Sequence, residues 1–159
     1  MTTKTALRPL VPHDCDAVFE MMADPAGVRM AAFTAPDPTD RAAFDTHVAK
    51  LFGNPDIHLF AIVDESSQLV GTISTFPSDG GLTEVTYWVD REHWGRGHAS
   101  HALSLVTGQV GRPLVARVVA DNDASRRVLD KAGFRAVATD RDFAHGRQAE
   151  VEEVVLRLE

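Results

Sequence analysis

Short apolar stretches, separated by turn-forming residues, divide the chain into seven predicted strands. Nearly every residue of 57–63 is apolar, as in a strand that is buried on both faces. The run Pro77-Ser78-Asp79-Gly80-Gly81 is a strong turn signal and predicts an antiparallel hairpin between its flanking strands. The predicted strands are residues 5–10, 57–63, 69–76, 82–89, 114–120, 134–139 and 151–158, of which the last two form a closing hairpin.

Apolar residues three and four positions apart predict four helices between these strands. The stretch 25–38 carries several prolines and a glycine and is predicted to be irregular. The predicted helices are residues 16–23, a helix that begins with Thr39 or Asp40 as its N-cap, a helix that begins at Gly97, and residues 124–132.

The predicted order of elements is therefore β-α-α-β-β-β-α-β-α-β-β. The helix that begins at Gly97 connects strand 82–89 to strand 114–120, and such a crossover makes the two strands parallel. The remaining connections favour antiparallel pairs. The sequence thus predicts one α/β domain over residues 1–159. Its single sheet is mixed, with parallel and antiparallel strands, as in α+β folds. Ligands of such sheets bind at the carboxyl ends of the parallel strands, here near Val89 and Ala120.

Composition and charge narrow the class of protein. Of the 159 residues, 44% are hydrophobic and 25% are charged, which is the balance of a globular domain. Cys15 is the only cysteine, which excludes a disulfide framework and favours a reducing, cytoplasmic location. No apolar run approaches the roughly 20 residues of a membrane span, so no membrane partner is expected. The net charge of −7, with arginines scattered among acids, argues against a nucleic-acid partner.

The segment 91–100, between a predicted strand and a predicted helix, has the composition of an anion site. Gly95 and Gly97 remove side chains where the backbone bends and where a ligand could approach closely. The N–H groups of a helix start have no partners within the helix, and they suit a pyrophosphate. The spacing is neither Gly-x-Gly-x-x-Gly nor a P-loop, and an ordinary strand–helix turn explains these residues equally well. A hydroxyl and two positive charges come from Ser100, Arg91 and Arg96.

A second segment follows strand 114–120, where Asn122 precedes a short predicted helix and Gly133 ends it. Together the two segments resemble the GNAT superfamily of acetyl-CoA-dependent N-acetyltransferases. The loop Trp94-Gly95-Arg96-Gly97-His98-Ala99 is similar to the family's Gln/Arg-x-x-Gly-x-Gly/Ala motif, and its form looks like that of the Rim-type ribosomal-protein acetyltransferases. That branch usually has Tyr where this chain has His98. The downstream match comprises Asn122, Ser125, Lys131, Gly133 and Phe134, and the strand Thr83-Glu84-Val85-Thr86-Tyr87-Trp88-Val89 is similar to the family's Ala-Glu-Ile-Gly-Tyr-Trp-Leu.

The resemblance implies a fold in which two parallel central strands splay apart and admit the pantetheine arm of acetyl-CoA. Homodimers are common in the family, so a homodimer is a further expectation. In the family the irregular segment forms a wall of the acceptor site, which makes Met30 and Phe33 candidate acceptor-binding residues; packing in the core is the alternative. The residues implied to bind acetyl-CoA are Trp88 and Val89 through their backbone, Arg91, Arg96, Gly97, His98, Ala99 and Ser100 at the pyrophosphate, and Asn122 at the pantetheine.

The implied reaction is direct attack of a neutral amine, from a protein N-terminus or a small molecule, on the thioester. The amine must lose a proton, and Glu84 is the candidate base because the Rim-like branch has a glutamate there. A solvent-facing strand carboxylate is the alternative. Many members protonate the departing thiolate with a Tyr seven residues after the Asn, but this chain has Leu129. Ser125 is the candidate substitute, unless it only caps its helix.

Two rival functions stay open on the sequence alone. The first is a CoA-binding regulatory module without turnover, which the departure at Leu129 favours; the second is a nucleotide-binding domain that uses the glycine loop. His93, His98 and His101 lack a carboxylate or Cys that would complete a ligand set, so no metal is expected. These histidines are expected at a solvent-exposed helix edge, and His58 is expected in the core or the cleft.

Overall fold

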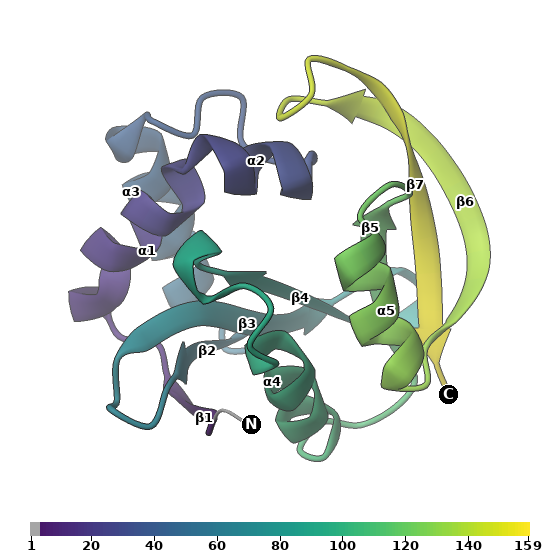
Figure 1. Cartoon of the computed structure of the whole chain (residues 1–159), viewed down its shortest axis with the longest axis horizontal. Coiled ribbons are helices and arrows are strands. Elements are labelled where there is room, and N and C mark those ends of the chain that lie inside the picture. Colours follow the sequence, from purple (N-terminus) through teal and green to yellow (C-terminus); the bar gives the residue numbers. More distant parts are fainter. Residues whose placement is uncertain (1–3) are drawn as a thin grey trace.

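Residues 4–159, which the computed structural model describes, form one seven-stranded sheet with helices on both of its faces (Figure 1). The strand order is β1-β2-β3-β4-β5-β7-β6, and only β4 and β5 run parallel to each other within the described part of the chain. The predicted mixed sheet is confirmed. Its strands are β1 (Ala6–Pro9), β2 (His58–Val63), β3 (Leu69–Pro77), β4 (Thr83–Val89), β5 (Leu114–Val119), β6 (Arg135–Ala144) and β7 (Ala149–Leu158).

Four helices form where the apolar spacing predicts them, and a fifth forms where it does not. The helices of residues 4–159 are α1 (Cys15–Ala23), α2 (Pro25–Ala31), α3 (Arg41–Phe52), α4 (His98–Thr107) and α5 (Asp123–Lys131). Single turns of 3₁₀ helix cover Pro12–Asp14, Asp79–Gly81 and Arg91–His93. No helix in residues 4–159 is both long enough and apolar enough to cross a membrane.

The prediction that residues 25–38 are irregular is wrong for their first half, because Pro25–Ala31 forms α2. Asp24 is its N-cap and accepts a hydrogen bond from the Gly27 N–H at 3.0 Å, while Pro25 occupies the first helical position. Gly27, a residue with low helix propensity, is the reason that the sequence did not predict this helix. Gly27 is buried against β4, and a Cβ at this position would lie 2.9 Å from the indole of Trp88. Glycine is therefore what allows α2 to rest on β4.

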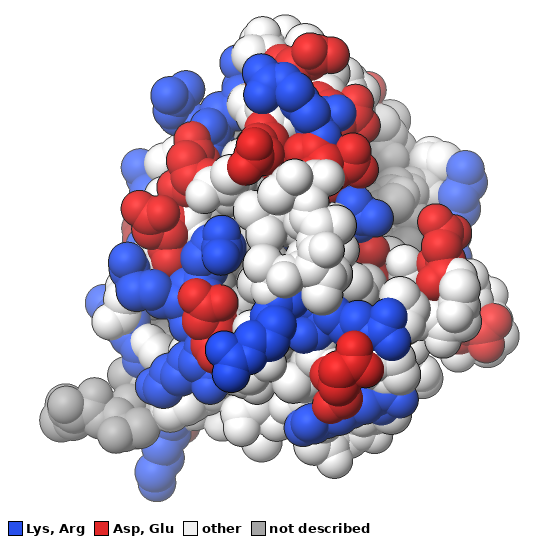
Figure 2. Space-filling model, turned by 90° about the vertical axis from the view of Figure 1, so that its right-hand side faces the viewer, with Lys and Arg blue, Asp and Glu red and all other residues white. Residues whose placement is uncertain are grey.

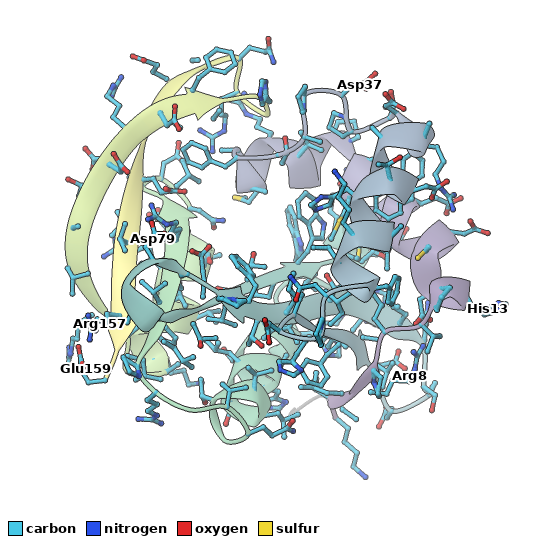
Figure 3. The ribbon with its side chains drawn as sticks, turned by 180° about the vertical axis from the view of Figure 1, so that it is seen from behind. Arg8, His13, Asp37, Asp79, Arg157 and Glu159 are labelled. Carbon is cyan, nitrogen blue, oxygen red and sulfur yellow. The ribbon has the colours of Figure 1, made fainter. Side chains whose placement is uncertain are left out.

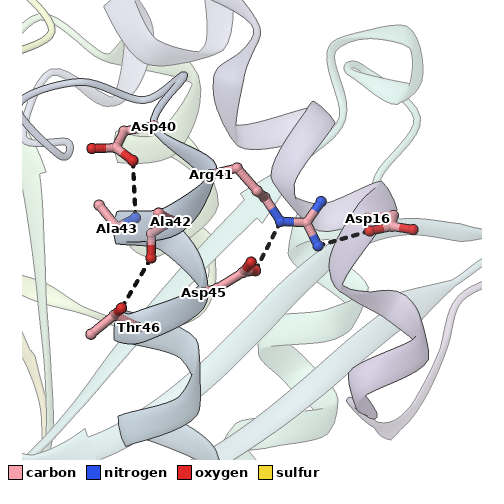
Figure 4. Close-up of polar contacts among 7 residues, drawn as sticks. All are labelled: Asp16, Asp40, Arg41, Ala42, Ala43, Asp45 and Thr46. Carbon is pink, nitrogen blue, oxygen red and sulfur yellow. Dashed lines mark hydrogen bonds and ion pairs between the residues drawn. The ribbon is translucent and has the colours of Figure 1, made fainter.

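Two groups of polar contacts join α1, and the turn that precedes it, to neighbouring elements. Arg41 at the start of α3 donates to Asp45 and to Asp16 of α1, both at 2.8 Å, and Asp40 caps α3 (Figure 4). Arg8 of β1 is labelled in Figure 3. Its two terminal nitrogens donate to the carboxylate of Asp14, each at 2.8 Å. Asp14 is almost fully buried, and the Arg8 guanidinium lowers the pKa of its carboxyl. The second group is a half-buried ion pair, because Asp14 is buried and the Arg8 side chain is partly exposed. The first group lies at the surface and contributes little.

The main core lies between the sheet and the pair α4 and α5. From α4 it receives Ala102, Leu103 and Val106, all fully buried, and from α5 it receives Leu129. Gly133 adopts a φ of +97° after α5, and the buried Phe134 follows it into β6. This packing fixes the N-terminal ends of α4 and α5 beside the parallel strands.

The closing hairpin is longer than predicted. β6 was expected to end at residue 139 but continues to Ala144, and all of its residues except Ala144 are exposed. An exposed edge strand needs no apolar alternation, because pairing with β7 alone defines its course. Figure 2 shows this side of the molecule, where Lys and Arg side chains are interspersed with Asp and Glu.

Candidate active site

β4 and β5 pair over only two rungs and then diverge. The pairs are Thr83–Leu114 and Glu84–Val115, after which β4 continues to Val89 without β5 beside it. The predicted splay is therefore confirmed. A pocket of about 630 Å³ lies in the gap, which is the size of a small-molecule site. The predicted site residues that line it are Met30, Phe33, Glu84, Trp88, Val89, Gly97, His98, Ala99, Ser100, Asn122 and Ser125.

The backbone of β4 offers hydrogen-bonding groups to this gap. The Ser78 N–H donates to the Leu82 carbonyl, and the Asp90 N–H donates to the Val70 carbonyl, both at 2.8 Å. Because backbone groups alternate sides along an antiparallel strand, even-numbered residues of β4 bond to β3, while Tyr87 and Val89 face the gap. The backbone of Trp88 thus faces β3, contrary to our expectation, and its indole lies against Gly27. The Val89 carbonyl accepts from the Trp94 indole N–H at 2.8 Å.

The glycine loop opens beside this strand end. Gly95 and Gly97 have φ values of +74° and +84°, and a Cβ on either would meet no atom within 4 Å. The N–H groups of the first turn of α4 have no partners within the helix, and they lie next to this open space. Arg91 and Arg96 do not line the pocket. Arg91 instead pairs with Asp24, the N-cap of α2, at 3.2 Å.

The histidines of this region are not at an exposed helix edge as predicted. His93 and His98 are buried, and the Nδ1 atom of His98 lies 3.0 Å from the Thr5 hydroxyl oxygen. Burial lowers the pKa of His98, and the nearby His93 acts in the same direction. His58 was also placed wrongly, because it is exposed on β2. Among the described residues, no three His, Cys, Asp or Glu side chains are grouped closely enough to hold a metal ion.

Glu84 lies at the last paired rung, where the gap begins. Its side chain is only 16% exposed, and this burial raises the pKa of its carboxyl. Arg117 of β5 opposes the shift with its Nε 3.6 Å from the Glu84 carboxylate, and the same guanidinium donates to Glu153 of β7 at 3.1 Å. Our reading of the sequence missed Arg117 and Glu153. Arg117 could have been noticed as the single charge within an apolar strand.

Ser125 is held from two sides at the opposite wall of the gap. Its N–H donates to the Asn122 side-chain oxygen at 3.1 Å, which makes Asn122 the N-cap of α5. Its hydroxyl oxygen lies 2.6 Å from that of Tyr87. Burial raises the pKa of Tyr87 to about 12, so this phenol stays protonated. Sequence reasoning missed Tyr87 as a site residue, although the quoted strand motif contains it, while Leu129 is part of the core.

A mixed sheet that opens between two parallel strands, beside a glycine loop at the start of a helix, is the arrangement that the resemblance to acetyltransferases implies. Residues 4–135 match the Acetyltransferase (GNAT) domain family, and the chain belongs to this family. It is therefore an acetyltransferase.

The relatives agree with this assignment. An uncharacterized N-acetyltransferase, p20 of Bacillus licheniformis, is 25% identical over 161 residues, which cover 94% of this chain and 90% of that protein. RimJ of Mycobacterium smegmatis, solved with CoA-disulfide, has a TM-score of 0.81 at 21% identity over 97% of this chain and 81% of that one. A phosphinothricin acetyltransferase of Sinorhizobium meliloti, solved with AcCoA, has a TM-score of 0.81 at 18% identity over 99% and 88%. These structural likenesses show the shared fold.

Proposed function

We propose that this enzyme transfers acetyl from acetyl-CoA to a primary amine by direct attack, with Glu84 as base and Ser125 as proton donor. The acceptor is a protein N-terminus or a small-molecule amine. The observation that carries the proposal is the position of Glu84, a mostly buried carboxylate where the two parallel strands separate. Its 16% exposure argues against the alternative, a solvent-facing strand carboxylate.

The residues of the pocket fit acetyl-CoA from one end to the other. The pantetheine arm can take backbone hydrogen bonds from the gap-facing edge at Tyr87 and Val89. The diphosphate suits the N–H groups of the first turn of α4, because they carry partial positive charge. Arg127 and Lys131 of α5 line the same pocket and add positive charge for the 3′-phosphate on the ribose of CoA. The backbone of Trp88 and the side chain of Arg91 have no part in this arrangement.

Glu84 is suited to take the proton that the acceptor's ammonium group must lose before the neutral amine attacks the thioester. Its raised pKa brings the carboxyl closer to the pH of the reaction, which improves a general base, while Arg117 keeps it ionised. Most of the catalysis then comes from holding the amine and the thioester together, because a thioester is already reactive toward neutral amines.

Ser125 is suited to hydrogen-bond the departing thiolate. Its hydroxyl lies against the Tyr87 hydroxyl, and both residues line the pocket. Because a free thiol has a pKa of about 8.5, the thiolate is a good leaving group and this donor contributes modestly. A serine that only caps its helix would need no such phenol partner, since Asn122 already caps α5.

The experiment is thiol release from acetyl-CoA with a panel of amines. The panel contains a short peptide with an N-terminal alanine, phosphinothricin, an aminoglycoside and a simple alkylamine. We expect Glu84→Gln to lower kcat by about a hundredfold or more, in the range of general-base catalysis, with a smaller change in CoA affinity. CoA binding without turnover of any amine would instead support the regulatory module. Thermal stabilisation by ATP or NAD rather than CoA would support a nucleotide-binding domain. A cytoplasmic location and a homodimer stay predictions.

A further inference from the structure

The turn between β6 and β7 reaches across the molecule to the C-terminal end of α2, as the yellow turn beside the purple helix in Figure 1 shows. Two contacts join them. The Gly146 N–H donates to the Ala32 carbonyl at 2.8 Å, and the Arg147 Nε donates to the Arg29 carbonyl at 2.6 Å. The Arg147 side chain is only 13% exposed, although it projects from a turn.

The C-terminal end of α2 requires partners of this kind. The helix has only seven residues. In any helix, the last carbonyl groups have no N–H donor within the helix itself. In this helix they accept hydrogen bonds from other segments of the chain. Asn122 completes the set, because its side-chain nitrogen lies 3.4 Å from the Met30 carbonyl oxygen. A guanidinium at this end also matches the negative end of the helix dipole.

The other side of the same guanidinium holds the loop between β5 and α5. Its two terminal nitrogens donate to the two carboxylate oxygens of Asp121, each at 2.8 Å, and Asp121 immediately precedes Asn122. One side chain therefore joins α2, the hairpin turn and the loop that carries Asn122. The fit is close, because a Cβ on Gly146 would lie 2.4 Å from the Val28 carbonyl oxygen.

Two of these three segments, α2 and the loop that carries Asn122, border the active-site pocket. Met30 and Phe33 line it where the acceptor is expected, and Asn122 lines it where the cosubstrate is expected. Resting on the proposed function, we infer that Arg147 is a positioning residue, which sets the acceptor wall relative to the bound cosubstrate. It acts through α2 and Asn122 and does not itself line the pocket.

The test is Arg147→Ala, with hydrogen–deuterium exchange of α2 and steady-state kinetics on the panel amine that the wild-type enzyme acetylates fastest. We expect the α2 amides to exchange at least about tenfold faster and the KM for the amine to rise about tenfold. The expected kcat stays within about threefold, and the Kd for CoA stays within about twofold. Arg147→Lys should recover only part of the loss, because an ammonium cannot span both partners as the guanidinium does.

Arg141→Ala is the matched control, because Arg141 belongs to the same hairpin and its side chain donates to the Glu150 carbonyl of the hairpin itself. It should behave as wild type. If Arg147→Ala does not fold, Asp121→Asn removes the carboxylate charge and one of its two acceptor oxygens, and it should give the same changes at smaller size. Unchanged α2 exchange or an unchanged amine KM in a folded variant overturns the inference. If the wild-type enzyme acetylates no amine, the proposed function fails, while the exchange measurement still decides the role of Arg147.

Discussion

Replacing Gly97 by alanine separates backbone strain from loss of the cosubstrate site. Gly97 has a φ of +84°, a conformation that costs an L-residue about 1–2 kcal/mol. No atom lies within 4 Å of the added methyl group, so no clash adds to this strain. In a chain of this size, we expect a loss of about 1–2 kcal/mol in unfolding free energy and a fall of about 2–8 °C in Tm.

The effect on CoA affinity should be much larger than this strain implies. The methyl group would occupy the open space beside the first turn of α4, where the proposal places the diphosphate. Losing one or two charge-assisted hydrogen bonds, at roughly 1.5–3 kcal/mol each, raises the Kd by at least about tenfold. Isothermal titration with CoA measures it directly.

Gly81 supplies the control for this experiment. It has a φ of +77° in the turn between β3 and β4, and a Cβ there would also meet nothing within 4 Å. Gly81→Ala should therefore cost about the same stability as Gly97→Ala while the CoA affinity stays unchanged. If both variants bind CoA like the wild type, the glycine loop is an ordinary strand–helix turn and the assignment of the diphosphate site is wrong.

Two further predictions concern single contacts. Tyr87→Phe removes the hydroxyl that lies 2.6 Å from that of Ser125. We expect kcat to fall about three- to tenfold with the KM for the amine unchanged. An unchanged kcat would mean that Ser125 acts without the Tyr87 hydroxyl. Asp14 has a lowered folded-state pKa because Arg8 donates to it, so its contribution to stability is present above the unfolded pKa near 3.8 and is lost as the pH falls through the lower folded value. Urea unfolding from pH 6 to pH 3 should therefore show Asp14→Asn losing less stability on acidification than the wild type, and parallel losses would contradict this.

The sequence predicted the parts of the fold that depend on local patterns. Apolar spacing located four of the helices in residues 4–159, and the crossover rule gave the parallel pair β4 and β5. The pattern failed at α2, where a capping aspartate and Pro25 outweigh Gly27. It also failed at β6, which is held by its neighbour and not by an apolar face. In α2 the glycine is explained by its close packing against Trp88, and β6 is held by its pairing with β7; both are tertiary contacts that a local pattern does not show.

The site shows the same division. The glycine loop and Asn122 form local motifs, so the sequence located them, and the structure brings them to one pocket. Arg117 and Tyr87 act through partners that are distant in the chain, Glu84 and Ser125, and no local pattern marks such pairs. The two buried histidines likewise show that a polar residue next to a loop is placed by its tertiary partners, here Thr5 for His98.

Along β4, successive side chains point to opposite faces of the sheet, and the backbone groups of alternate residues point to the gap. The proposed functional groups of β4 therefore lie in three directions. Glu84 and Trp88 share the face that α2 covers, and Tyr87 projects to the opposite face toward α5, while the backbone of alternate residues faces the gap. A shift of one residue in the pairing of β4 would move each side chain to the other face and would turn the other set of backbone groups to the gap. The Glu84 carboxylate would then point into the core beneath α4. The register is fixed by the two rungs to β5 and by the turn that precedes β4, where Gly80 and Gly81 both have positive φ. The turn between β3 and β4 therefore helps to decide which residue of β4 can serve as the base.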